Sequence, residues 1–185
     1  MKRIRARAAK ITGALVAAGA FIVMAAGGAQ ASAADTSLQS EITRALERTP
    51  GGVQISANQV AWQNGKVVLT IPLPGEKFAR GAAEPVSALG TRNCEYTWVC
   101  LYDGKDYEGR RLQFSDCNEF NDLSSWDFND KMTSWHNNQT SGTKARFYNW
   151  SKGQWVLVYT TPGAQSWDGE VSSSINNMVD GIRAC

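Results

Sequence analysis

Residues 100–109 read Cys-Leu-Tyr-Asp-Gly-Lys-Asp-Tyr-Glu-Gly, and this stretch decides the fold. Four residues separate Tyr102 from Tyr107, and Gly109 follows one residue later. A hairpin folded back onto its own sheet fits this spacing, because the two tyrosine rings can pack together across the bend. Gly109 can adopt a positive φ that a Cβ atom would penalise. We therefore interpret Tyr102, Tyr107 and Gly109 as a structural motif of a β-sheet.

The region around this motif, residues 93–185, differs in composition from the rest of the chain. It holds 15 of the 18 aromatic residues and all four cysteines. It has no clear helical period, and clusters of Gly, Asn, Asp and Ser separate its strand-like runs. These runs are 97–102, 110–115, 145–150 and 155–159. The pattern predicts a mainly β sandwich or barrel with an aromatic core.

A second motif follows at residues 129–134, which read Asn-Asp-Lys-Met-Thr-Ser. The two motifs together resemble the βγ-crystallin Greek key, whose calcium-binding members carry the pattern N/D-N/D-x-x-S/T-S. The resemblance implies a βγ-crystallin-like double Greek-key sandwich over residues 93–185. The counterpart in the second half, residues 176–181, departs from the pattern because it ends in Asp-Gly.

This resemblance also implies a weak, structural calcium site. Asn129, Asp130 and Ser134 would supply the hard oxygen ligands that Ca²⁺ prefers. An alternative interpretation needs no metal, because Asp130 and Ser134 can also hydrogen-bond the backbone of a turn.

The N-terminus has the pattern of a secretory signal peptide. Five basic residues in the first ten positions precede an apolar stretch at 11–26, and small residues fill 27–34. A retained membrane anchor is the alternative, but the abundant Ala and Gly favour cleavage. We predict a signal peptide over 1–34, a secreted, extracellular product, and no association with a membrane after cleavage.

Export predicts that the cysteines form disulfides, since all four lie in the exported part and their number is even. Three connectivities are possible. We favour Cys94–Cys100 as a short clip, with Cys117–Cys185 tying the C-terminus to the body and closing the longer loop.

Residues 35–92 form a different, aliphatic-rich region. Leu38, Ile42 and Leu46 recur at helical spacing, and strand-like runs follow at 53–55, 60–62 and 67–71, with the turn signal Asn64-Gly65 between the last two. We predict a small α+β segment over 35–71, either a pro-region or a retained module, and a linker rich in Gly, Ala and Pro over 72–92.

Charge and composition exclude several classes of function. Beyond residue 34 the chain has 14 basic residues against 17 acidic ones, which argues against binding to nucleic acid. The single histidine, His136, stands beside Asn137 and Asn138, where we expect a solvated loop. Nothing near it suggests a nucleophile or an orienting acid, so we do not expect an enzyme.

The signal peptide, the Cys-x5-Cys clip, the tyrosine motif and the segment 129–135 are together similar to the secreted streptomycete metalloproteinase inhibitor family. This resemblance implies a monomeric peptidase inhibitor that blocks an extracellular protease of the thermolysin-like class with a rigid loop. We predict Tyr96, Thr97 and Trp98, inside the clip, as protease contacts; the alternative places Trp98 in the core. The chain departs from the family in lacking a second closely spaced cysteine pair. The alternative function is a calcium-binding extracellular module without inhibitory activity.

Overall fold

The computed structural model describes residues 33–81, 84 and 92–185. The predicted signal peptide, apart from Ala33 and Ala34, and much of the predicted linker lie outside the described residues. The helix is α1 (Ala33–Arg48), and short 3-10 helices are η1 (Gln63–Gly65), η2 (Lys105–Tyr107) and η3 (Leu123–Trp126). The strands are β1 (Val53–Ser56), β2 (Gln59–Trp62), β3 (Val67–Thr70), β4 (Trp98–Tyr102), β5 (Arg111–Phe114), β6 (Phe120–Asp122), β7 (Ser134–Asn138), β8 (Arg146–Ser151), β9 (Gln154–Thr160), β10 (Ser166–Asp168) and β11 (Gly181–Arg183).

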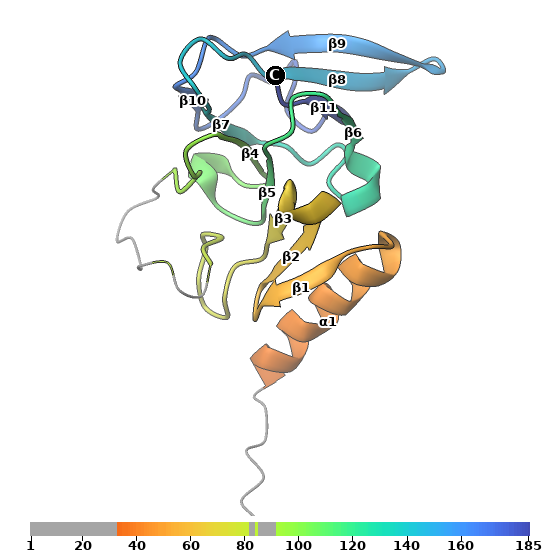
Figure 1. Cartoon of the computed structure of the whole chain (residues 1–185), viewed down its shortest axis with the longest axis vertical. Coiled ribbons are helices and arrows are strands. Elements are labelled where there is room, and N and C mark those ends of the chain that lie inside the picture. The colour runs from red at the N-terminus through yellow and green to blue at the C-terminus, as the bar shows by residue number, and fades with distance from the viewer. Residues whose placement is uncertain (1–32, 82–83, 85–91) are drawn as a thin grey trace, which may run out of the picture. The chain divides into compact units, whose positions relative to one another are not determined.

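The strands form two sheets in which every pair is antiparallel (Figure 1). One sheet has seven strands in the order β1-β2-β3-β5-β4-β7-β10, and the other has four in the order β6-β11-β8-β9. The mainly β prediction is confirmed, and the two sheets are consistent with a β sandwich; the Greek-key assignment stays a prediction. No helix among the described residues is long and apolar enough to span a membrane.

The N-terminal elements form where the spacing of apolar residues predicts them. Leu38 and Ile42 of α1 are buried against the sheet, one helical turn apart. The turn at Asn64-Gly65 has both residues at positive φ, which Asn and Gly tolerate best, and it reverses the chain between β2 and β3.

Strand β3 joins these elements to the rest of the molecule, because it pairs with β5 along its whole length. Leu69 lies opposite Leu112, and Val67 lies opposite Phe114. Across this junction the Trp62 and Trp126 rings meet edge to face with centroids 6.2 Å apart. Residues 33–71 therefore share one sheet and one hydrophobic core with the C-terminal part.

Four strands, β6, β7, β10 and β11, have no counterpart among the expected runs. Three of them are only three residues long, and β7 reads Ser-Trp-His-Asn-Asn, too polar to suggest a buried strand. Their pairing partners come from distant parts of the sequence, such as β6 with β11, so local patterns carry little signal for them.

Candidate functional site

Two disulfides are present, Cys94–Cys100 and Cys117–Cys185, which is the pairing favoured from the sequence. The clip Cys94–Cys100 spans the start of β4, with its Cα atoms 5.8 Å apart. The other bridge joins the C-terminal residue to the segment between β5 and β6.

The loop inside the clip is held at several points. The Thr97 N–H donates to the Asn138 carbonyl at 2.9 Å, and the Asn138 side-chain amide donates to the Cys94 carbonyl at 2.8 Å. Thr97 has φ +78°, a left-handed conformation that is uncommon for a β-branched residue. The disulfide and Asn138 therefore fix a short loop in a conformation that the free chain would rarely adopt.

The three predicted contact residues differ in exposure. Tyr96 is 59% exposed and Thr97 is exposed, whereas Trp98 is half-buried. Trp98 packs against a small cluster made of the clip cysteines, Tyr102 and Tyr107. The loop thus presents Tyr96 to solvent on a base formed by Trp98.

The tyrosine motif lies beneath Trp98. The Tyr102 and Tyr107 rings meet edge to face with centroids 5.4 Å apart. Gly109 has φ +79°, and a Cβ atom there would lie 2.0 Å from a carboxylate oxygen of Asp103. Asp103 uses its carboxylate to accept from the backbone and the Nε of Arg110, both at 2.7 Å.

The third predicted calcium ligand, Ser134, contacts the turn that carries the tyrosine motif. Ser134 is fully buried, and its hydroxyl donates to the Gly104 carbonyl at 2.7 Å and accepts from the Tyr107 N–H at 3.2 Å. Both hydrogen bonds pin the 104–107 turn to β7. These contacts match the alternative in which the hydroxyl supports a turn, and the calcium assignment stays a prediction.

Asn129 and Asp130 line a pocket of about 530 Å³ beside the β8–β9 hairpin; its other lining residues are Asp122, Ser124, Trp150, Trp155 and Asp180. Burial, and then the nearby Asp130 and Asp122 carboxylates, raise the pKa of Asp180. Among the described residues, no group of three or more His, Cys, Asp and Glu side chains is close enough to hold a metal ion.

The expectation of a solvated loop around His136 is wrong. His136 lies within β7, between β4 and β10, and is only 7% exposed. Burial and, to a smaller extent, the Arg92 guanidinium lower the pKa of His136 to about 4. Its neighbours in sequence also have structural roles. The Asn137 side-chain amide donates to the Thr143 carbonyl and the Thr161 hydroxyl, and the Asn138 amide donates to the Cys94 carbonyl.

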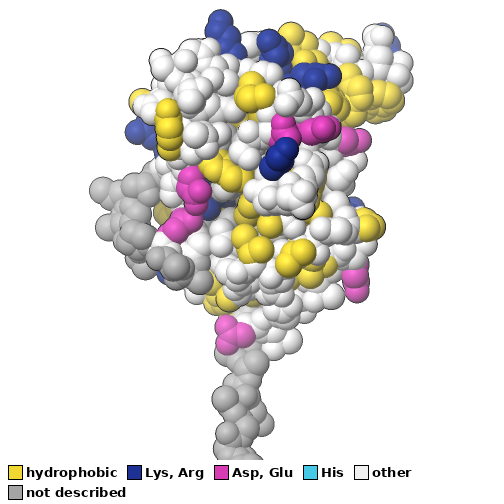
Figure 2. All heavy atoms as spheres, in the orientation of Figure 1, with side chains coloured by type: hydrophobic (Ala, Val, Ile, Leu, Met, Phe, Trp, Pro, Cys, Tyr) yellow, Lys and Arg dark blue, Asp and Glu magenta, His cyan; other side chains and the backbone are white. Residues whose placement is uncertain are grey.

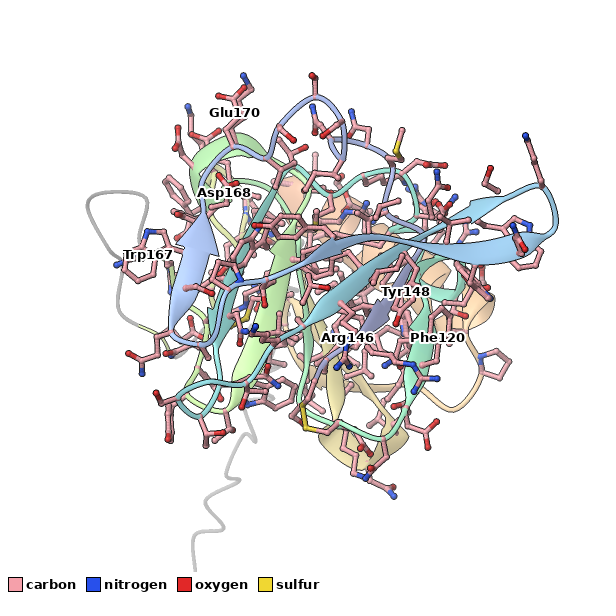
Figure 3. All side chains as sticks on the ribbon, turned by 90° about the horizontal axis from the view of Figure 1, so that it is seen from above. Phe120, Arg146, Tyr148, Trp167, Asp168 and Glu170 are labelled. Carbon is pink, nitrogen blue, oxygen red and sulfur yellow. A yellow bond between two sulfur atoms is a disulfide. The ribbon has the colours of Figure 1, made fainter. Side chains whose placement is uncertain are left out.

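The outer face of the four-stranded sheet is a surface that was not predicted from the sequence. Figure 3 shows Phe120, Arg146 and Tyr148 lying together on it, away from Trp167, Asp168 and Glu170. The strand 146–151 has aromatic residues in both phases of its alternation, so one set faces the core and the other faces solvent. Aromatic residues on both faces of this strand are the sequence signal that could have indicated the exposed aromatic surface.

Comparison with known proteins gives one match. Neither the curated proteins nor the solved structures contain a significant match to the chain. Residues 87–163 match the model of peptidase inhibitor family I36, a stretch that includes the clip, the tyrosine motif and the β8–β9 hairpin. The resemblance drawn from the sequence is thus confirmed over residues 87–163, which are similar to peptidase inhibitor family I36.

Proposed function

We propose that the chain is a secreted inhibitor of an extracellular metallopeptidase of the thermolysin-like class, acting by steric occlusion. The family match over residues 87–163 carries the proposal, since that family inhibits peptidases. The metallopeptidase target rests on the resemblance to the streptomycete inhibitors. No chemical step is assigned to this chain.

The clip loop is the proposed contact surface. Its disulfide and the two hydrogen bonds with Asn138 hold the loop before it meets a partner, so little conformational entropy is lost on binding. Tyr96 is the exposed aromatic anchor, and exposed aromatic residues on a rigid support are typical of binding hot spots. Trp98 supports the loop from below.

The extracellular setting is part of the proposal. Both disulfides fit an oxidising compartment, and the signal-like pattern over 1–34 would supply the route. Thr97, the remaining predicted contact residue, lies between Tyr96 and Trp98 in the loop.

The experiment is a titration of residues 35–185 against thermolysin and subtilisin at nanomolar peptidase. We expect stoichiometric inhibition of thermolysin and a rise in the inhibition constant of about tenfold or more for Tyr96→Ala. Trp150→Ala is the matched control, because Trp150 is also about half exposed (51%) but lies on the other sheet. A chain that inhibits neither peptidase would overturn the proposal. If Tyr96→Ala raises the inhibition constant no more than Trp150→Ala does, the contact lies outside the clip loop.

The alternative function, a calcium-stabilised extracellular module, has its support in the carboxylates around the pocket of Asn129 and Asp130. It predicts a melting temperature that rises with added calcium and no effect on peptidases. The inhibitor proposal predicts peptidase inhibition whether or not calcium binds, so the peptidase titration read together with melting curves in calcium or a chelator separates the two.

A further inference from the structure

The outer face of the four-stranded sheet, here called the aromatic face, carries side chains that the inner core does not use. Arg146, Tyr148 and Trp150 alternate along β8 and therefore share this face. Arg183 of β11 lies opposite Arg146, and Phe120 of β6 lies opposite Arg183. An antiparallel sheet ordinarily turns polar residues to solvent, so an aromatic outer face indicates an interaction surface.

Its centre is a connected set of rings. Phe120 meets Tyr148 at 5.3 Å and Trp155 at 4.7 Å between centroids, and Trp155 meets Trp150 at 4.9 Å. Gly181 makes this contact possible, because a Cβ atom there would lie 2.6 Å from the Phe120 ring and 2.9 Å from the Trp155 ring. The close packing of the aromatic centre therefore requires glycine at position 181.

Exposed apolar side chains extend the centre onto the hairpin. Trp150 is 51% exposed and Leu157 is 50% exposed. In Figure 2 hydrophobic side chains gather over the β8–β9 hairpin. Leu157 lies opposite Tyr148 and so faces the same way.

The two ends of the aromatic face carry opposite charge. Arg146 and Arg183 stand side by side at the β8 start, where the Arg183 guanidinium also lies 5.6 Å from the centre of the Phe120 ring. The other end, beyond Trp150, is the pocket lined by Asp122, Asp130 and Asp180. In the described part of the chain neither Arg183 nor any of these three carboxylates has an ion-pair partner.

We propose that this face binds a second copy of the chain, forming a two-fold symmetric dimer. A two-fold axis through the aromatic centre places the arginine end of each copy over the acidic pocket of the other, so both ends are complementary at once. The pocket walls suit a guanidinium, because two indoles offer cation–π contacts and three carboxylates offer acceptors. The monomeric state was expected from the sequence, in which this face could not be recognised.

The bipolar arrangement favours a copy of this chain over another partner, since a self-complementary surface is what such a dimer requires. The rings are tilted by 59° to 66° to one another, so they do not form the flat platform on which a sugar chain would stack. Four strands spaced about 4.8 Å apart give a face of only about 400 Å² for each copy, which predicts a weak, concentration-dependent dimer.

The test uses residues 35–185 in sedimentation velocity from low micromolar to about 0.5 mM, with an expected dissociation constant of about 10–100 μM. Arg183→Asp and Asp130→Arg should each weaken the dimer at least tenfold. Their equimolar mixture should dimerise again with nearly the original affinity, because in the mixed dimer the two changed residues face each other at one end while the other end keeps its original pair. Circular dichroism and the melting temperature of each variant report its folding.

A second pair of variants avoids the charged residues. Leu157→Arg should abolish the dimer, whereas Ile55→Arg, at a side chain of similar exposure (54%) on β1, should leave it unchanged. A chain that stays monomeric at the highest concentration overturns the proposal. So does a mixture of folded charge variants that fails to dimerise, or a Leu157→Arg variant that loses peptidase inhibition while the original chain is monomeric, since the face would then belong to the peptidase.

Discussion

The seven-stranded sheet is stabilised differently at its two ends. The end formed by α1 and β1–β3 contains no cysteine and relies on apolar packing, with Ile42, Val60 and Leu69 almost fully buried. The end formed by β4, β7 and β10 has the clip disulfide, the buried hydroxyl of Ser134 and the buried ring of His136. Burial holds the first end, while covalent and polar contacts hold the second.

This difference matters for function, because the proposed contact loop belongs to the polar end. Apolar packing tolerates changes in redox state and pH, whereas a disulfide and a buried histidine respond to both. Reduction or acid should therefore disturb the clip end first.

The largest effect is expected at the apolar end. Leu69 is 2% exposed and lies between Val60 of β2 and Leu112 of β5. Leu69→Ala leaves a cavity at the junction of the two parts of the chain and should lower the free energy of unfolding by about 2–5 kcal/mol. Urea denaturation followed by tryptophan fluorescence and by circular dichroism measures it.

The same experiment tests whether the two ends unfold together. Because they share one core, both signals should shift by the same amount. The exposed Ile55→Ala is the control and should change stability by less than about 0.5 kcal/mol. Two separate transitions would show that residues 33–71 unfold on their own.

The second effect is a pH dependence at the polar end. The folded pKa of His136, about 4, lies below the ordinary 6.5, so the unfolded chain binds more protons between these values. Stability should be fully present above pH 6.5 and fall by up to about 3 kcal/mol as the pH drops to about 4. Denaturation at a series of pH values measures this loss.

Two observations isolate the histidine. His136 is the only histidine, so its ring resonances in NMR report the folded pKa directly. The carboxylates with lowered pKa, Asp116 and Asp127, titrate below their ordinary 3.8 and so act in a more acidic range. A His136→Gln variant should lose the slope between pH 4 and 6.5; an unchanged slope would assign it to other groups.

The third effect is that of the clip. Cys94→Ala with Cys100→Ala opens a short loop, and the loss of chain closure should lower the free energy of unfolding by about 2 kcal/mol. Leu69 and the clip cysteines belong to different hydrophobic clusters, so Leu69→Ala should cost the same with or without the clip. Double-variant denaturation checks this additivity, and a coupling above about 1 kcal/mol would show that the ends are not independent.

Much of this fold could be predicted because its signals are local. The helical spacing of Leu38 and Ile42, the Asn64-Gly65 turn and the Tyr102–Tyr107 spacing each describe a few neighbouring residues. The pairing of β3 with β5 could not be predicted, since the two strands lie far apart in the sequence. The boundary drawn at residue 71 follows composition, which says nothing about a shared sheet edge.

The site was less predictable for a related reason. A polar residue offers the same atoms to a ligand or to the protein, and the sequence does not say which it meets. Ser134 hydrogen-bonds a turn, a role that the sequence offered beside calcium binding, and His136 was expected in solvent but lies within a sheet. The aromatic face needed β6, β8, β9 and β11 side by side before its rings and charges could be recognised.

The smallest expected effect is at the tip of the clip loop, where the backbone is strained. Thr97 has φ +78°, and a left-handed conformation costs a residue with a side chain roughly 1–2 kcal/mol. Thr97→Gly removes that cost but adds freedom to the unfolded chain, so the net gain in stability should stay below about 1 kcal/mol. Thr160→Gly, at an exposed position of β9, should instead lower stability by about 0.5–1 kcal/mol. Thermal denaturation gives the sign of each change.

Opposite signs would show that the clip end holds a strained backbone while an ordinary strand does not, and two losses would contradict that strain. Without the clip the loop can relax, so the gain from Thr97→Gly should shrink in the Cys94→Ala/Cys100→Ala background, tying the strain to the disulfide.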